Sequence, residues 1–272
     1  MDDIDRFLDE DLSKIGDITT ESLFKNELGK ANIITKEDSI LAGIQEAEKV
    51  FLKTGAKLKP VFFDGDKIKK NEIVAKVEGS IKSILIGERL ALNFICRMSA
   101  IASETYFLTK KCKKINPKVK IAATRKTTPG FRKYEKKAVI IGGGDPHRFG
   151  LYDAVLIKDN HLKSSKNTIS KSIKIIKEKV KDKIIEIEVE NEIDALEAAS
   201  NDIDYIMLDN FDSLEGKKVA KKIREINPRI KIEVSGKITP DNIINYASYA
   251  DRISLGYLTH SVKNKDFSLE LI

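Results

Sequence analysis

The sequence predicts an α/β protein whose larger, barrel-like part has a parallel sheet and follows a smaller α+β domain. From about residue 119 onward, short β-rich segments alternate with polar or glycine turns and with helix-sized stretches, as in βα units. Polar residues stand at or near the carboxyl end of each β-rich segment. Residues 1 to about 110 show a different pattern, with short strands and Asp-Gly turns, and therefore predict a separate companion domain.

The N-terminal part combines strand and helix patterns. Its predicted strand regions are 31–43 and 61–80, and its predicted helices are 44–55 and about 83–114. The boundary near residue 110 falls inside the long helix rather than in a flexible linker. We therefore assign residues 1–110 to the companion domain and 111–272 to the barrel-like domain, and we expect the tail of about 262–272 to pack back on the companion domain.

Six strands are predicted in the C-terminal part. They are 119–124, 154–159, 184–190, 205–210, 230–236 and 252–256. Two of the junctions that precede them resemble each other, "KKINPKVKIAA" and "REINPRIKIEV". In both, Asn-Pro ends a helix, because proline cannot continue a helix and restricts the residue before it. The similarity supports a recurring αβ unit.

Composition limits the class of protein. The chain has 272 residues, 41% of them hydrophobic and 33% charged, which is typical of a folded protein. No apolar run approaches the roughly 20 residues of a membrane span, and the acidic start shows no secretory signal, so we expect a cytoplasmic protein without membrane contact. Cys96 and Cys112 are interpreted as reduced structural thiols. The net charge of +7 is compatible with nucleic acid or with an acidic small molecule, and the lysine-rich segment 171–183 reads as a solvated helix face.

The polar residues at the strand ends carry the functional prediction. They are Arg125 and Lys126, Lys158, Glu188 and Glu190, Asp209, Ser235, and Gly256. In barrel-like α/β folds the loops after the strands converge on one mouth, so we expect these residues to lie close together.

The stretch "EIEVE" alternates with period two. We expect Glu186, Glu188 and Glu190 to point into the barrel, while Ile187 and Val189 meet the helices. Inward carboxylates need cations or metal to neutralise them. The candidate cations are Arg125, Lys126, Arg148 and Lys158. A solvated edge strand is the alternative.

Segment 124–162 looks like an anion site. Arginine offers a planar fork and lysine a point charge, so together they suit a substrate with two carboxylates or a pyrophosphate. The triple glycine Gly142–Gly144 is compatible either with close approach to a ligand or with a plain turn, and it does not belong to a P-loop. We interpret His147 as functional and His161 as a buried, hydrogen-bonded structural histidine.

The later strands suggest a phosphate and metal side. Glu188 and Asp209, from neighbouring strands, suit Mg²⁺ that is bound largely through substrate phosphates. Ser235, Gly236 and Gly256 suit a monophosphate held by backbone amides.

Taken together, these motifs resemble the quinolinate phosphoribosyltransferase family. The motifs are "GDITT" (16–20), "GERLALNFICRMSAIAS" (87–103), "ATRKTTPGFR" (123–132), "GGGDPHRFGLYDAVLIKDNH" (142–161), "EIEVE" (186–190), "IMLDN" (206–210), "EVSGKI" (233–238) and "GYLTHS" (256–261). The resemblance implies an incomplete (open) α/β barrel preceded by an α+β sandwich domain. It also implies a homodimer, or a higher oligomer, in which the sandwich of one subunit covers the barrel mouth of the other.

The resemblance implies roles for individual residues. Quinolinate would be bound by Arg125, His147, Arg148 and Lys158, with Arg89 from the partner subunit. Lys126 would face both substrates and act in catalysis with Glu188 and Asp209, which would bind 5-phosphoribosyl 1-pyrophosphate and Mg²⁺. Ser235, Gly236 and Gly256 would bind the 5-phosphate. The implied reaction transfers the phosphoribosyl group to quinolinate with loss of CO₂, in the synthesis of NAD.

Two departures from the family pattern stand out. Pro146 precedes the His-Arg pair where the family more often has asparagine, as in some archaeal-type members and in a molybdenum-transport-associated paralogue. We expect that paralogue to alter the "KDNH" segment, which is intact at 158–161. "SGK" stands at 235–237 where "SGG" is common. The alternatives to the quinolinate enzyme are that paralogue and a non-catalytic anion- or nucleic-acid-binding protein.

Overall fold

The computed structural model describes residues 2–272, and the chain divides into two compact units. The first unit comprises the chain up to Glu104 together with Ile140–Gly142 and Val262–Ile272. The second comprises Thr105–Val139 and Gly143–Ser261. The division falls inside the 33-residue helix α4, Ile81–Lys113. In the described chain no helix, α4 included, is both long and apolar enough to cross a bilayer.

The first unit is built on an antiparallel sheet of order β12-β1-β5-β3, beside a small β2-β4 pair. Its elements are α1 (Asp3–Leu12), α2 (Ile18–Leu23), β1 (Leu28–Thr35), β2 (Ser39–Ile40), α3 (Ile44–Thr54), β3 (Lys57–Pro60), β4 (Lys67–Ile68), β5 (Ile73–Ser80), the first part of α4 and β12 (Phe267–Leu271). The C-terminal strand β12 pairs with β1, from Thr35 opposite Phe267 to Ala31 opposite Leu271. The two ends of the chain therefore share one sheet.

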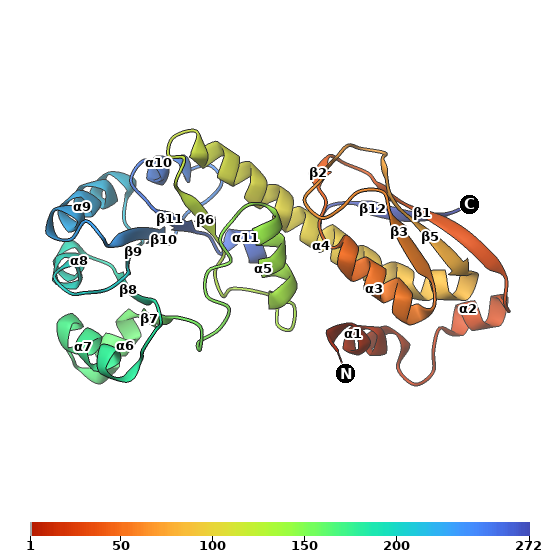
Figure 1. The fold of residues 1–272 in the computed structure, drawn as a ribbon, viewed down its shortest axis with the longest axis horizontal. Coiled ribbons are helices and arrows are strands. Elements are labelled where there is room, and N and C mark those ends of the chain that lie inside the picture. Colours follow the sequence, from red (N-terminus) through yellow and green to blue (C-terminus); the bar gives the residue numbers. More distant parts are fainter. Residues whose placement is uncertain (1) are drawn as a thin grey trace. The chain divides into compact units, whose positions relative to one another are not determined.

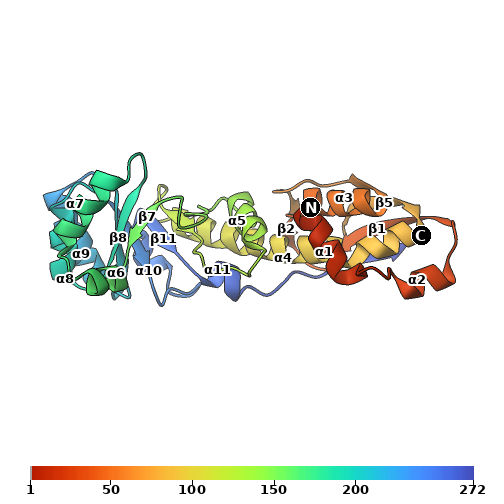
Figure 2. The same ribbon diagram turned by 90° about the horizontal axis from the view of Figure 1, so that it is seen from below.

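Two N-terminal helices were not predicted. Asp2 is the N-cap of α1 and forms a capping box with Asp5. At the start of α2, the side chain of Asp17 accepts hydrogen bonds from the backbone amides of Thr19 and Thr20. The acidic start of the sequence is thus a helix-capping signal. Figure 2 shows α1 beside α3, where the ammonium group of Lys53 pairs with the carboxylates of Asp2 and Asp5.

The second unit contains the predicted six-stranded parallel sheet, with helices between its strands (Figure 1). Its elements are β6 (Lys120–Ala122), α5 (Arg132–Ile141), β7 (Val155–Ile157), α6 (Asp159–Ser165), α7 (Ile169–Lys179), β8 (Ile185–Val189), α8 (Glu192–Ala199), β9 (Tyr205–Asp209), α9 (Ser213–Ile226), β10 (Lys231–Ser235), α10 (Ile244–Ala247), β11 (Arg252–Ser254) and α11 (Tyr257–His260). The strand order is β6-β11-β10-β9-β8-β7. Within residues 2–272, β6 and β7 do not pair, so the barrel is open there and the predicted fold class is confirmed.

The two faces of this sheet differ in chemistry. Ile187, Val189, Ile206 and Leu208 belong to a continuous apolar core with residues of the surrounding helices. Burying an aliphatic side chain of this kind contributes roughly 1.5–3 kcal/mol, so this outer face holds the strands to the helices. The opposite face carries Glu186 and other polar side chains. The period-two prediction for the strand is confirmed, and the interior of the barrel is left for polar chemistry.

The triple glycine Gly142–Gly144 allows close packing of the backbone. A Cβ on Gly144 would lie 2.6 Å from Cγ2 of Thr105 and 2.8 Å from the carbonyl oxygen of Ile121. Gly143 has φ +80° and open space around it. The close backbone approach at Gly144 is therefore to β6 and α4 of the protein itself rather than to a ligand.

We expect Gly144→Ala to lower the free energy of unfolding by about 1–3 kcal/mol, because the new methyl group has no room against the backbone of β6. Gly143→Ala is the matched control. It should cost only about 1 kcal/mol, since the methyl group meets nothing and only the positive φ opposes it. Urea unfolding of the two variants measures both effects. Equal costs would contradict the close-packing explanation.

Candidate active site

A hollow of about 370 Å³ lies at the carboxyl ends of the parallel strands. Eight of the predicted site residues line it: Arg125, Lys126, His147, Arg148, Lys158, Glu188, Asp209 and Ser235. They come from the segments after β6 and α5 and from the ends of β7 to β10. The convergence predicted for the strand ends therefore occurs within the second unit.

Four other predicted residues do not line this hollow. Arg89 is exposed on α4 in the first unit. Glu190 follows the end of β8 and is exposed, so the prediction that it points into the barrel was wrong. Gly236 and Gly256 lie next to lining residues in the sequence but do not line the hollow themselves.

Backbone pairing brings the two cationic segments together. Asp145 forms a parallel bridge with Ala122 of β6, through hydrogen bonds of 2.8 and 3.0 Å to Ile121 and Ala123. The next residues, His147 and Arg148, therefore lie beside the segment that leaves β6 with Arg125. His147 has φ +53°, a left-handed conformation stabilised by its amide, which donates to Oδ1 of Asp145 at 2.7 Å.

His147 takes part in a buried charge network. Its Nε2 lies 3.4 Å from Oε2 of Glu186 and 3.3 Å from Oε2 of Glu233. Nη1 of Arg252 lies 2.9 Å from the same oxygen of Glu233 and 3.9 Å from that of Glu186. Arg252 is directly opposite Glu233 in the parallel pairing of β10 with β11, and its guanidinium lies 4.1 Å from the ring centre of Tyr205. Oδ2 of Asp145 lies 3.5 Å from Nε of Arg252, so three carboxylates and two cations meet in this network.

The network keeps His147 charged. Burial opposes the charge, but the hydrogen bonds to Glu186 and Glu233 outweigh it and raise the pKa of His147 to about 9. For Glu233, burial opposes ionisation, yet His147 and Arg252 lower its pKa overall. Burial and the charge of Glu233 raise the pKa of Glu186. The stability that comes from the raised pKa of His147 is full below pH 6.5, its ordinary value, and is lost as the pH rises through about 9.

His147, Glu186 and Glu233 could also be considered as metal ligands, because their ligand atoms lie within 4.8 Å of one another. An imidazole must lose its proton to bind a metal, and the guanidinium of Arg252 already pairs with Glu233 and lies 3.9 Å from Glu186. The set therefore fits a self-compensated ion network better than a metal site.

Arg125 and Arg148 are cations without an acidic partner. Within residues 2–272 neither guanidinium forms an ion pair, and Nε of Arg125 is buried without a hydrogen-bond partner. Nη1 of Arg148 contacts the carbonyl oxygen of Ala154 at 3.4 Å. Burial, and then the charge of Arg125, lower the pKa of Arg148. Two neighbouring guanidinium groups in one hollow make a site for an anion.

Glu188, at the end of β8, has a direct cationic partner in the hollow. Nζ of Lys158 pairs with Oε2 of Glu188, as predicted for that lysine. Within residues 2–272, Arg125, Lys126 and Arg148 form no direct ion pair with the inward carboxylates, although the charges of Glu186 and Glu188 act on Arg148. The direct partners of Glu186 are His147 and Arg252. Burial and the charge of Glu188 raise the pKa of Asp209. A further cation is therefore electrostatically favourable beside these two carboxylates.

The segment after β10 has unusual backbone geometry. Gly236 has φ +80°, and a Cβ there would lie 2.3 Å from Oδ1 of Asn210. Lys237 has φ +52°, a conformation that costs a non-glycine residue roughly 1 kcal/mol and explains why glycine is common at this position. A Cβ on Gly256 would lie 3.0 Å from Cδ of Lys126. The ends of β10 and β11 thus have little room for side chains.

His161 is hydrogen-bonded but not buried. Its Nδ1 accepts the backbone N–H of Lys158 at 2.9 Å, at the start of α6, and its side chain is exposed. The predicted structural role is confirmed, whereas the predicted burial was wrong. His161 fixes the start of the helix that follows Lys158 and so helps to place that lysine.

Sequence reasoning missed Glu233 and Arg252. Each is a buried charged residue of a short strand and stands next to buried aliphatic residues, Ile232 and Val234 for Glu233 and Ile253 for Arg252. That pattern is a detectable signal, because a buried charge in a parallel strand requires a partner. It does not indicate which partner, since the register of β10 against β11 is a tertiary property.

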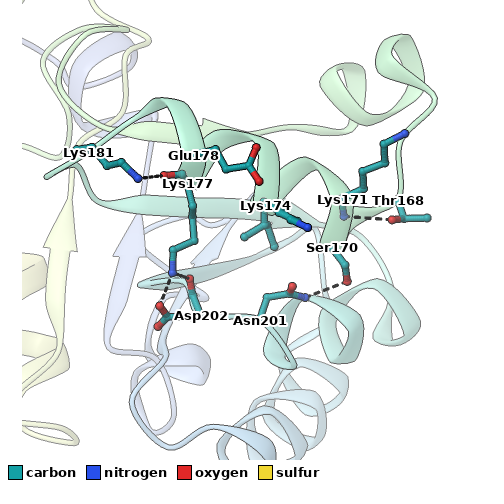
Figure 3. A pocket seen from close by; sticks show the side chains of 10 residues that line it. Thr168, Ser170, Lys171, Lys174, Lys177, Glu178, Lys181, Asn201 and Asp202 are labelled. Carbon is teal, nitrogen blue, oxygen red and sulfur yellow. Dashed lines mark hydrogen bonds and ion pairs between the residues drawn. The ribbon is translucent and has the colours of Figure 1, made fainter.

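Another hollow, between α7 and the turn after α8, is lined by Lys171, Lys174, Lys177 and Lys181 (Figure 3). Its polar groups bind one another: Lys177 pairs with Asp202, Lys181 donates to the carbonyl oxygen of Lys177, and Asn201 donates to Ser170. The predicted solvated lysine face of α7 is confirmed, and the hollow offers no group for chemistry.

Comparison with known proteins assigns the chain to a family. The quinolinate phosphoribosyl transferase C-terminal domain matches residues 101–270, and the N-terminal domain matches residues 17–99. The chain belongs to the quinolinate phosphoribosyl transferase family. The match includes both units and agrees with the resemblance found from the motifs.

Relatives in the quinolinate phosphoribosyl transferase family are similar over most of the chain. A probable nicotinate-nucleotide pyrophosphorylase (carboxylating) of Methanocaldococcus jannaschii is 43% identical over 94% of this chain and 92% of its own length. A mitochondrial quinolinate phosphoribosyltransferase (decarboxylating) of Nicotiana tabacum is 36% identical over 97% of this chain and 80% of its own. The structure of the nicotinate-nucleotide pyrophosphorylase of Ehrlichia chaffeensis has a TM-score of 0.92 at 39% identity, over 99% of this chain and 97% of that one.

We expect Glu233→Gln to lower the pKa of His147 from its value of about 9, because burial then opposes the charge with one carboxylate fewer. The titration of the His147 ring followed by NMR measures this shift. Glu225→Gln is the control, since Glu225 is an exposed residue paired only with Lys221 on the same helix. An unchanged His147 pKa in Glu233→Gln would contradict the network.

Proposed function

We propose that the chain transfers the phosphoribosyl group of 5-phosphoribosyl 1-pyrophosphate to quinolinate, giving nicotinate mononucleotide, pyrophosphate and CO₂ in the biosynthesis of NAD. Family membership supports the reaction class. The observation that carries the proposal is the pair Arg125 and Arg148, two guanidinium groups without acidic partners in one hollow. Such a pair suits an acceptor with two carboxylates.

The acceptor side is formed by four cations. Arg125 and Arg148 each offer a fork to a carboxylate, the protonated His147 adds a charge between them, and Lys158 is a point charge at the rim. These groups bind and orient quinolinate. Because His147 is charged through its own buried partners, its charge does not depend on the substrate.

The donor side is formed by the ends of β8 to β11. Glu188 and Asp209 fit Mg²⁺, since Asp209 is a half-buried carboxylate whose pKa is raised by burial and by the negative charge of Glu188. When bound, the ion neutralises charge that develops on the departing pyrophosphate. We assign the 5-phosphate to Ser235, Gly236 and Gly256, at the ends of β10 and β11, where backbone amides are suited to bind a phosphate.

The chemistry needs positioning and charge rather than a nucleophilic side chain. The ring nitrogen of quinolinate attacks the anomeric carbon while the bond to pyrophosphate breaks, and the leaving oxygen keeps the electron pair. The alkylated ring then accepts the electron pair of its bond to the adjacent carboxylate, which departs as CO₂, and the ring carbon takes up a proton. Lys126, at the mouth of the hollow, faces both substrates and stabilises negative charge in the first step.

We assign Arg89 to the site of a partner subunit in a homodimer. In this chain Arg89 is exposed on the part of α4 that belongs to the first unit, and it does not line the hollow. An exposed arginine on a helix otherwise well buried is available to a second subunit. The cytoplasm is the proposed compartment.

Purified protein should convert quinolinate and 5-phosphoribosyl 1-pyrophosphate into nicotinate mononucleotide and CO₂ when Mg²⁺ is present. Chromatography of the nucleotide together with trapping of released CO₂ measures both products. Chelation of the metal with EDTA should stop the reaction, and excess Mg²⁺ should restore it. Absence of turnover, or equal turnover of nicotinate, would overturn the proposed function.

The division of the site predicts opposite effects of two substitutions. Arg125→Ala should raise KM for quinolinate roughly 10- to 150-fold, as expected for losing hydrogen bonds to a charged group worth about 1.5–3 kcal/mol. Asp209→Ala should instead raise KM for 5-phosphoribosyl 1-pyrophosphate and the Mg²⁺ requirement. Steady-state kinetics separate the two, with the exposed Arg229→Ala as control. The reverse pattern would refute the division.

A further inference from the structure

Helix α5 contacts the segment that carries Arg125. Both carboxylate oxygens of Glu135 accept hydrogen bonds from Thr128, from its backbone amide and from its hydroxyl, each at 3.0 Å. Nε of Arg132 donates to the hydroxyl of Thr127, also at 3.0 Å. Two consecutive residues of the turn after Arg125 and Lys126 are therefore held by the first turns of α5.

The same helix contacts the segment that carries His147 and Arg148. Nη1 of Arg132 donates to the carbonyl oxygen of Phe149 at 3.0 Å. Nζ of Lys136 donates to the carbonyl oxygen of Pro146, and it lies 5.4 Å from the ring centre of Phe149. The pair His147 and Arg148 is thus bounded on both sides by backbone carbonyls that α5 binds.

Burying the ammonium group of Lys136 costs the folded state free energy. Its side chain is fully buried, and within the described residues it forms no ion pair. Burial, followed by the charge of Arg132, lowers its pKa to about 8, so it remains mostly protonated at neutral pH. An apolar residue of similar shape would avoid the cost of burying an ammonium group. Stability alone therefore does not account for a lysine here.

We propose that Lys136 is a positioning residue for acceptor binding, which fixes the His147–Arg148 backbone through the carbonyl oxygen of Pro146. With Arg132, it makes α5 a common support for both arginines of the acceptor side, so that their spacing is set by one rigid helix. That quinolinate is the ligand rests on the proposed function. That Lys136 fixes this backbone segment rests on the contacts alone. It also gives a role to Pro146, whose backbone supplies an acceptor and needs no N–H partner.

Isothermal titration of wild type, Lys136→Met and Lys136→Gln tests the ligand part. Lys136→Met removes charge and donor and should weaken quinolinate binding about tenfold or more, while the Kd for 5-phosphoribosyl 1-pyrophosphate changes less than about twofold. Lys136→Gln keeps an N–H donor and should recover part of the loss. Lys133→Met, an exposed lysine of the same helix, is the matched control.

Hydrogen exchange tests the structural part without any ligand. In Lys136→Met the amides of His147 and Phe149 should exchange faster, while those of β9 keep their wild-type rates. Failure of the wild type to bind quinolinate would overturn the proposed function, but hydrogen exchange would still test whether Lys136 fixes the His147–Arg148 backbone. Unchanged quinolinate affinity with unchanged exchange, or equal weakening of both substrates, would overturn the role of Lys136. If Lys136→Met does not fold, Lys136→Gln is compared with Lys133→Met in the same two measurements.

Discussion

The ion network of Glu186, Glu233, His147 and Arg252 is the constraint on which the rest of the site depends. Carboxylates on the inner face of a parallel strand would be too costly alone, and a buried imidazolium equally so. Paired with Arg252, they form a nearly neutral unit beneath the hollow. Because His147 and Arg252 pair with these buried carboxylates, Arg125 and Arg148 are left without an acidic partner among the described residues and are available to a ligand.

In this arrangement, the groups that hold the site in place are largely different from the groups that would bind substrate. The apolar outer face of the strands binds the helices, the buried ions fix His147, and α5 fixes the backbone on either side of the two arginines. Few of the groups that support the site face the hollow themselves. Preorganisation of this kind is what an electrostatic mechanism needs, since charges that are already placed cost no rearrangement when the reaction occurs.

Much of the fold and of the site could be predicted from sequence, because alternation and strand-end polarity are local signals. Glu186 and Lys158 were placed correctly on such grounds. Glu233, Arg252 and Lys136 were not, since their importance arises from strand register and from a contact between a helix and a loop. Glu190 was misplaced because β8 ends at Val189, and periodicity does not indicate where a strand stops.

The gap between β6 and β7 has a consequence for how the acceptor site can change. In a closed barrel, a backbone ladder on both sides of every strand would hold each binding residue in a fixed register. Here the segment with His147 and Arg148 is joined to β6 by a single bridge, and side chains of α5 together with Glu186 and Glu233 hold it in place. A few substitutions in one helix could therefore shift these cations, and adapt the site to another acid, without altering the strands of the barrel.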